Sequence, residues 1–187
     1  MDMLLAGILL WSAVHYVPSL MPNIKIKMIE LLGNSYRAVF SLLIIASIAL
    51  MVMGWKATIP EFIYQPPEFG PILTSVSMII AFYLMGSSHG KANIKRFLRH
   101  PMLCGIIFWA GGHLLSNGDK RSIILFGGMI IWAVVEIIAI NKRDGPREKP
   151  EPASIIIDIR KFAVAVVLYF IVAYAHPYFT GVEVMRL

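Results

Sequence analysis

The chain has 187 residues, of which 58% are hydrophobic and 15% are charged, and its net charge is +6. Soluble domains carry roughly a quarter charged residues. Here the apolar residues occur in runs long enough to cross a bilayer, so the composition excludes an ordinary soluble domain. The basic residues lie in short segments between these runs, which excludes a nucleic-acid-binding face. The single cysteine, Cys104, excludes an internal disulfide and a multi-cysteine metal site.

The apolar runs predict an all-α fold, a single domain over 1–187 built as a polytopic bundle of about six transmembrane helices. In chain order the runs cover 3–21, 36–55, 71–88, 101–116, 122–140 and 160–179. The first run lacks the basic leader and the small-residue cleavage site of a signal peptide, so we expect it to be a retained span. The fourth run is short and begins at Pro101, which a helix tolerates in its first turn.

The connections between the runs carry signals of their own. Residues Ile24–Leu32 alternate lysine with isoleucine and methionine, which favours a short helix lying in the membrane interface. Residues 56–71 contain four prolines and predict a stiff, irregular loop. A turn is expected at 117–119, and the charged segment 141–153 is expected to be mobile.

The distribution of charge predicts the orientation of the bundle. Thirteen of the 17 Lys and Arg residues lie between the first and second runs, the third and fourth, or the fifth and sixth, or in the first two residues of the run that follows. Cytoplasmic segments of membrane proteins are enriched in basic residues. We therefore expect these three connections in the cytoplasm and both termini on the opposite side.

Histidines are the side chains most suited to chemistry inside such a bundle. An ionisable side chain within a span is costly and marks a functional candidate, and imidazole is a common ligand of metals and haem. His15 and His113 lie inside runs, whereas His89, His100 and His176 lie at run ends, where hydrogen bonding to interfacial water or backbone is the simpler interpretation. At 1.5 Å per residue His15 and His113 differ in depth by about 10 Å, and His176 matches His113 better.

Other residues could support a histidine site. Glu136 is the carboxylate deepest inside a run, where it could accept the ring N–H of His15 or pair with Lys142 or Arg143. The guanidinium groups of Arg37 and Arg99, and of Arg96, could meet cofactor carboxylates or lipid headgroups. Small residues in the fourth run, such as Gly111 and Gly112, permit close approach of a neighbouring helix or of a flat cofactor. We expect Cys104 to be buried and unreactive in the same run.

Several motifs together resemble the NnrU family over nearly the whole chain. They are Arg99-His100-Pro101-Met102, Trp109, His113-Leu114-Leu115-Ser116-Asn117-Gly118-Asp119, Leu125-Phe126-Gly127-Gly128, His15 with Pro18-Ser19, Tyr36-Arg37, and His176-Pro177 with Gly181. The resemblance implies a multi-pass protein of the bacterial inner membrane that supports nitrite and nitric oxide reduction in denitrification.

The resemblance also implies kinship with the plant 15-cis-zeta-carotene isomerase, which binds haem b through histidines. By position, His15 and His113 match its haem histidines and are the expected metal ligands, with His176, His100, Arg37 and Arg99 as further candidates around the cofactor. The cysteine that precedes the second histidine in the isomerase is replaced here by Ala110-Gly111-Gly112. A redox switch of ligands is therefore not expected.

Three alternatives remain open from the sequence. One is a haem-dependent isomerase or oxidoreductase acting on a lipophilic substrate dissolved in the membrane. Another is a transporter or an assembly factor for a respiratory reductase. The third is a membrane methyltransferase of the isoprenylcysteine type, whose R-H-P-x-Y-x-G motif resembles Arg99–Gly105 except that Leu103 replaces the tyrosine.

Overall fold

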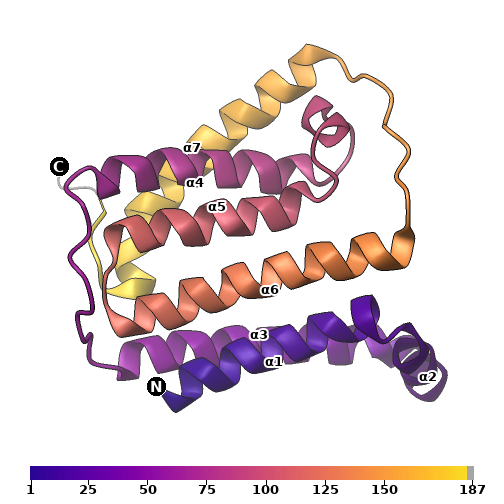
Figure 1. Ribbon diagram of the computed structural model, residues 1–187, viewed down its shortest axis with the longest axis horizontal. Helices are drawn as coiled ribbons and strands as arrows, with labels where there is room; N and C mark the ends of the chain where they lie inside the picture. The colour runs from indigo at the N-terminus through magenta and orange to yellow at the C-terminus, as the bar shows by residue number, and fades with distance from the viewer. Residues whose placement is uncertain (185–187) are drawn as a thin grey trace.

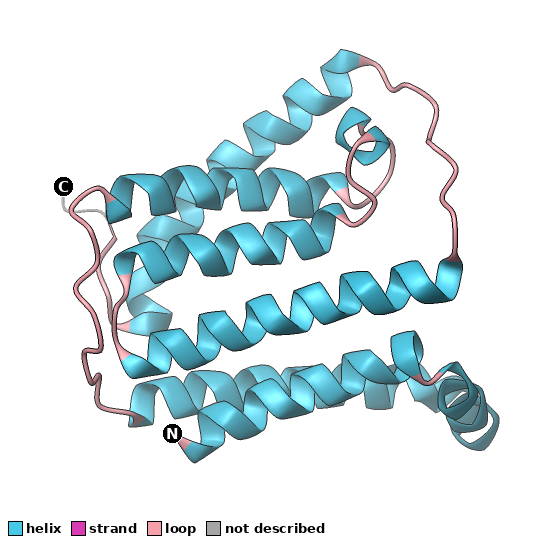
Figure 2. Ribbon diagram, viewed as in Figure 1, coloured by secondary structure: helices cyan, strands magenta, loops and turns pink. Residues whose placement is uncertain are grey.

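The computed structural model describes residues 1–184 and is built from α-helices with two short 3₁₀ turns (Figures 1 and 2). The elements are α1 (Asp2–Leu20), α2 (Pro22–Leu32), η1 (Gly33–Ser35), α3 (Tyr36–Ala57), α4 (Gly70–Ser87), η2 (Asn93–Arg96), α5 (Pro101–Ser116), α6 (Lys120–Asp144) and α7 (Ile155–Thr180). The expected all-α fold is confirmed. Among the described residues, strand-like pairing is limited to one isolated antiparallel β-bridge between Phe62 and Asp119.

The long helices alternate in direction, as the sequence predicts (Figure 1). The N-terminus, the loop between α3 and α4 and the turn between α5 and α6 lie at one end of the bundle. At the opposite end lie α2, η2 and the segment between α6 and α7, so the three basic connections share one end. Four helical stretches, Asp2–Leu20, Pro22–Ala57, Gly70–Ser87 and Lys120–Asp144, are long and apolar enough to cross a membrane. The count of six spans and the side of the termini stay predictions.

Two helices are longer than the apolar runs that mark them. Helix α6 continues to Asp144, where Gly145 ends it with a positive φ of 67°, so the first part of the expected mobile segment is helical. Helix α7 begins at Ile155, several residues before the run, because its first turns are held against α4 and η2 through Asp158. Charged residues that sequence reasoning assigns to loops therefore extend the helices beyond the apolar core.

Helix α1 packs between α3 and α6, α5 packs between α4 and α6, and α7 packs on α4. Close contact of α1 with α3 depends on glycine, because a Cβ built on Gly54 would lie 2.3 Å from the backbone nitrogen of Leu4. The main cluster of buried residues is centred on α6 and consists of Ala110, Phe126, Met129, Trp132 and Ala133. Helix α6 is thus the element against which the two halves of the bundle pack.

The outer surface of the bundle is apolar. Leu9, Leu42, Ile72 and Ile131 are each more than 60% exposed, and α7 exposes a succession of large apolar side chains while burying Asp158, Ala165 and Ala173. In a soluble protein such continuous apolar surface would be unusual. Lipid covers it in a membrane protein, where every backbone group is already bonded within a helix.

The proline-rich loop between α3 and α4 crosses the turn between α5 and α6. Backbone N–H groups of Ile63 and Tyr64 donate to the carbonyl of Gly118 at 2.8 and 3.1 Å. The Tyr64 hydroxyl donates to the carbonyls of Leu114 and Asn117. Partial burial, and secondarily the Asp119 carboxylate, raise the pKa of Tyr64. The loop is irregular, as expected, and these bonds fix it to the end of the bundle.

Candidate functional site

His113 lies in the last turn of α5, facing α6 and α7. Its Nδ1 is 2.7 Å from the carbonyl oxygen of Trp109, one helical turn earlier. The ring stacks on Phe126 of α6 with 4.6 Å between ring centroids and 26° between planes. The imidazole is therefore held in one orientation by its own helix and by α6.

His176 on α7 meets His113 across the bundle. Their ring centroids are 6.3 Å apart and the ring planes differ by 24°. Nδ1 of His176 is 2.9 Å from the carbonyl oxygen of Val182 and 2.9 Å from Oγ1 of Thr180, which itself donates to the His176 carbonyl. Of the five histidines, these two therefore form a facing pair contributed by separate helices.

The partners of both rings determine which nitrogen is free. A carbonyl oxygen only accepts, so Nδ1 carries the proton in His113 and in His176. The Nε2 atom of each neutral imidazole then keeps its lone pair, which is the form that ligates a metal. An Nδ1–H bonded to a backbone carbonyl is also the usual outer partner of a ligating histidine, because it fixes the ring and raises its basicity.

His15 lies in a different cluster. Its Nδ1 is 2.8 Å from the Trp11 carbonyl oxygen, and its ring packs against Trp11 and Trp132 with centroid distances of 4.3 and 5.0 Å. Trp132 and Phe126, the α6 neighbours of His15 and His113, are six residues apart, or about 9 Å along the helix. The structure thus brings His113 together with His176 and keeps His15 at another depth.

A family model described as "NnrU protein" matches residues 3–184 of the sequence. The chain belongs to the NnrU family. No match is found among curated proteins or among solved structures. The apolar helices and the family together identify a membrane protein.

In this NnrU-family chain Glu136 does not contact His15. Its side chain is buried, with 4% exposed, and accepts a 3.1 Å hydrogen bond from the Ser19 hydroxyl. The ring N–H of His15 instead donates to the backbone carbonyl of Trp11 on the same helix. The expected pairing with Arg143 is also absent among the described ion pairs, since Arg143 contacts Asp144 at 2.6 Å. Glu136 therefore joins α1 to α6 through Ser19.

The Arg99-His100-Pro101 motif links α5 to the end of α6. Arg99 donates to the Gly145 carbonyl at 2.6 Å and lies 3.9 Å from Asp144, and Nε2 of His100 is 2.9 Å from Oδ1 of Asn141. These groups bond to the protein's own chain, far from the His113–His176 pair at the other end of α5. Arg37 is exposed at the start of α3 and Cys104 is partly exposed, not buried.

The glycines of α5 divide into two roles. A Cβ on Gly112 would lie 2.8 Å from the Ser77 side chain, so Gly112 allows α5 to pack on α4. A Cβ on Gly111 would meet nothing within 4 Å, and the same holds for Gly127 on α6. Open space therefore adjoins the backbone of α5 within two residues of His113.

Sequence reasoning missed one polar cluster of the NnrU-family fold. Asp158 on α7 accepts hydrogen bonds from the backbone and the side-chain amide of Asn93 at 3.0 and 2.5 Å, and from the Tyr83 hydroxyl at 3.4 Å. In the sequence Asp158 is one charge among several that precede an apolar run. The signal that could have found it is its place within a helix of apolar neighbours, Ile155–Ile159, instead of in the proline-rich segment.

Proposed function

We propose that this NnrU-family chain is a haem b-binding protein of the bacterial inner membrane that supports the reduction of nitrite and nitric oxide. The observation that carries the proposal is the His113–His176 pair, with both Nδ1 atoms bonded to backbone carbonyls and both Nε2 atoms left to act as ligands. The role in denitrification comes from the family resemblance.

The donor set suits haem better than a bare ion. Among residues 1–184 no group of three or more His, Cys, Asp or Glu side chains is placed to hold a metal ion. Haem brings four nitrogen ligands of its own, so one or two imidazoles from the protein suffice. The open space at Gly111 adds room for a flat group beside His113.

In this proposal His113 and His176 would hold the haem iron, and His15 is the alternative ligand that the resemblance to the isomerase favours. The Trp109 carbonyl and the stacked Phe126 ring orient His113. Bound haem would supply reversible one-electron transfer. The protein would set the reduction potential through the basicity of the ligands and the burial of the site. Arg99 is committed to Gly145, which leaves the exposed Arg37 as the less constrained candidate for a cofactor carboxylate.

A second candidate function is a haem-dependent isomerase or oxidoreductase that acts on a lipophilic substrate. A cavity of about 170 Å³ supports it, formed by apolar side chains of α1, α2 and α3 that include Val14, Met28, Tyr36 and Phe40. The Phe40 ring lies between this cavity and His15, 5.7 Å from the imidazole centroid. An apolar cavity next to a polar group is the usual form of a site for a lipophilic ligand.

The visible absorption spectrum of the detergent-purified protein tests the haem proposal. We expect a Soret band in the wild type, and loss of haem affinity by more than about tenfold in His113→Ala and in His176→Ala, because each would remove a ligand nitrogen. His89→Ala is the matched control, since His89 is exposed at the other end of the bundle and bonds to Ser88.

The outcomes separate the alternatives. Haem loss in His113→Ala and His15→Ala, with His176→Ala unaffected, would assign the pair suggested by the isomerase. A colourless wild type after expression with sufficient haem, or full haem in the His113→Ala and His176→Ala double variant, contradicts the proposal.

A further inference from the structure

A second cavity, of about 270 Å³, lies between α4 and α7, and its lining includes neither His113 nor His176. Its lining includes Phe82 and Gly86 from α4 and Arg160, Lys161, Val164 and Leu168 from α7. A Cβ on Gly86 would meet nothing within 4 Å, so the absence of a side chain there leaves this space open. Arg160, Val164 and Leu168 are exposed, and the cavity therefore opens on the outer surface of the bundle.

The cavity has one cationic end and one apolar end. Arg160 and Lys161 stand at the end of the bundle that carries the basic connections, whereas Leu168 lies seven residues further along α7, or about 10 Å deeper. Phe82 lies about 6 Å deeper than Gly86 on α4 by the same rise. The apolar walls therefore extend from the cations toward the middle of the bundle.

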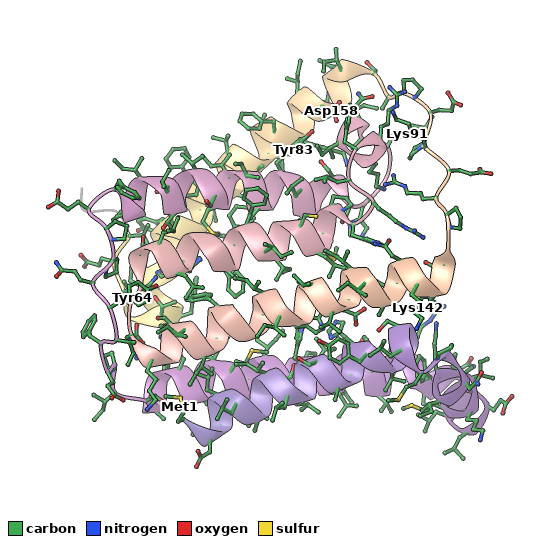
Figure 3. All side chains as sticks on the ribbon, in the orientation of Figure 1. Met1, Tyr64, Tyr83, Lys91, Lys142 and Asp158 are labelled. Atoms are coloured by element: carbon green, nitrogen blue, oxygen red, sulfur yellow. The ribbon has the colours of Figure 1, made fainter. Side chains whose placement is uncertain are left out.

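Among the described residues, no carboxylate lies within ion-pair distance of Arg160 or Lys161. The Lys161 ammonium donates to the carbonyls of Gly86 and His89 at 2.9 and 2.6 Å. The nearest acid along α7, Asp158, is buried and bonded to Asn93 and Tyr83 (Figure 3). Carbonyl oxygens hold the ammonium in place without cancelling its charge.

Further basic residues surround the cationic end. Lys91, at the same end of the bundle in Figure 3, precedes Lys95 and Arg96 of η2, which Asn93 attaches to α7 through Asp158. The Nε of Arg96 is buried with no hydrogen-bond partner among the described residues. The local charge is therefore positive at the expected depth of lipid phosphates.

We propose that this cavity binds an anionic phospholipid, with one acyl chain between α4 and α7 and the phosphate at Arg160 and Lys161. Basic pockets between transmembrane helices on the cytoplasmic side are known to bind anionic headgroups. The apolar walls add a requirement that a free phosphate cannot meet, since only a chain fills them. This site is independent of haem and uses neither His113 nor His176.

Native mass spectrometry of the detergent-solubilised full chain, titrated with dioleoyl phosphatidylglycerol, tests the proposal. We expect Gly86→Leu to weaken binding at least about tenfold while both cations remain, because the new side chain fills the apolar space. We expect Arg160→Gln and Lys161→Gln to weaken it about fivefold each. Lys142→Gln is the matched control, because Lys142 is an exposed cation at the same end outside the cavity.

The comparison of ligands and variants decides the outcome. Dioleoyl phosphatidylcholine should bind more weakly than phosphatidylglycerol, and glycerol phosphate, which has the charge without the chains, should not compete. Equal binding by Gly86→Leu and wild type, equal loss in Lys142→Gln and Lys161→Gln, or competition by glycerol phosphate overturns the proposal. The wild-type haem spectrum is expected in Gly86→Leu, so failure of this site and failure of the haem site are distinguishable.

Discussion

Backbone carbonyls explain how imidazoles are tolerated inside this apolar bundle. His15 and His113 each direct Nδ1 to the carbonyl four residues earlier on the same helix, and His176 directs Nδ1 to Val182. A buried donor without a partner costs about 1–3 kcal/mol, and these bonds remove that cost. The described contacts give the Nε2 atom of each of these rings no hydrogen-bond partner in the protein.

Gly118 is one of two glycines, with Gly70, where an added Cβ would meet a backbone atom at the shortest distance, 1.9 Å. A Cβ on Gly118 would lie 1.9 Å from the carbonyl oxygen of Tyr64, a backbone atom that cannot rotate away. We expect Gly118→Ala to lower the stability of the protein by about 1–3 kcal/mol or more, as overpacking does, and to lower the midpoint of thermal unfolding in detergent.

Gly127→Ala, in α6, is the control for this substitution. Its Cβ would meet nothing within 4 Å, and alanine is favoured over glycine inside a helix by up to about 1 kcal/mol. An unchanged or raised unfolding midpoint is expected. If Gly118→Ala unfolds at the wild-type temperature, the loop between α3 and α4 does not cross the turn as described.

Cys104 offers a test of whether sulfur takes part in cofactor binding. It precedes His113 by nine residues on α5, about 13 Å along the helix axis, so it cannot reach a group held by His113 in the way a cysteine one turn away could. We expect Cys104→Ser to leave the absorption spectrum of both oxidised and reduced protein unchanged. A shifted Soret band in this variant would identify the thiol as a ligand and contradict the assignment to histidine.

The site could be predicted only in part. The depth of a residue in a span follows from the number of residues before it. The sequence therefore predicts that His113 and His176 lie at similar depths and that His15 lies at a different depth. The direction in which a ring faces depends on how helices pack, and that hid the tryptophan cluster around His15 and the Ser19 partner of Glu136. The bonds that tie Arg99 and His100 to the end of α6 were also not predictable, because motif likeness does not show them.

At the scale of elements, α7 depends on a polar attachment at its start. Most of its side chains face outward, and Asp158 receives three hydrogen bonds from Asn93 and Tyr83. We expect Asp158→Ala to destabilise the protein by about 1–3 kcal/mol, because it leaves the Asn93 backbone N–H without its acceptor, although the Asn93 side chain still donates to the Ala153 carbonyl. Trypsin cleavage after Lys95 or Arg96 should become faster, since η2 loses its anchor.

Glu61→Ala provides the comparison for the loss of an acidic side chain. Glu61 pairs with Lys120 at 3.2 Å, with both side chains at least half exposed. Exposed pairs contribute about 0–1 kcal/mol, so little change in stability or cleavage is expected. Equal effects of the two substitutions would show that Asp158 is no more than a surface charge.

The helices were predictable because a bilayer imposes a minimum length on apolar runs. Their ends were not, because two physical effects compete there. A span predicted from hydropathy ends at the first charged residues. The helix itself continues through its backbone hydrogen bonds until a residue such as Gly145 breaks it. Helix α2 shows the reverse case: Pro22 at its first turn and Gly33 after its last residue gave bounds close to the expected ones.

At the scale of the whole molecule, the alternation of helices sorts the charges between two ends. The end with α2, η2 and the segment between α6 and α7 carries the basic connections. At the other end Lys120 pairs with Glu61, and Arg121 pairs with Asp119 at 3.2 Å and covers the Trp55 ring. Arg186, also expected at that end, lies outside the described residues. Ion pairs also occur at the basic end, where Arg99 and Arg143 approach Asp144 at 3.9 and 2.6 Å, so the asymmetry follows from the larger number of Lys and Arg residues at that end.

This asymmetry leads to a prediction of topology that labelling can test. In a Cys104→Ser background, single cysteines at Lys91 and Glu148 should react with a membrane-impermeant maleimide only after the membrane is opened, because basic connections stay in the cytoplasm. Cysteines at Gln65 and Lys120 should react in intact spheroplasts. All four positions are exposed or lie in irregular segments, so the substitutions should not disturb packing.

Helices that alternate in direction allow two outcomes for a continuous bundle: this pattern or its complete inversion. Inversion would place the His113–His176 pair and both termini on the cytoplasmic side. A mixed pattern, such as labelling of Gln65 without Lys120, would contradict the hydrogen bond from Lys120 to Glu61 and with it the arrangement of the whole outer end.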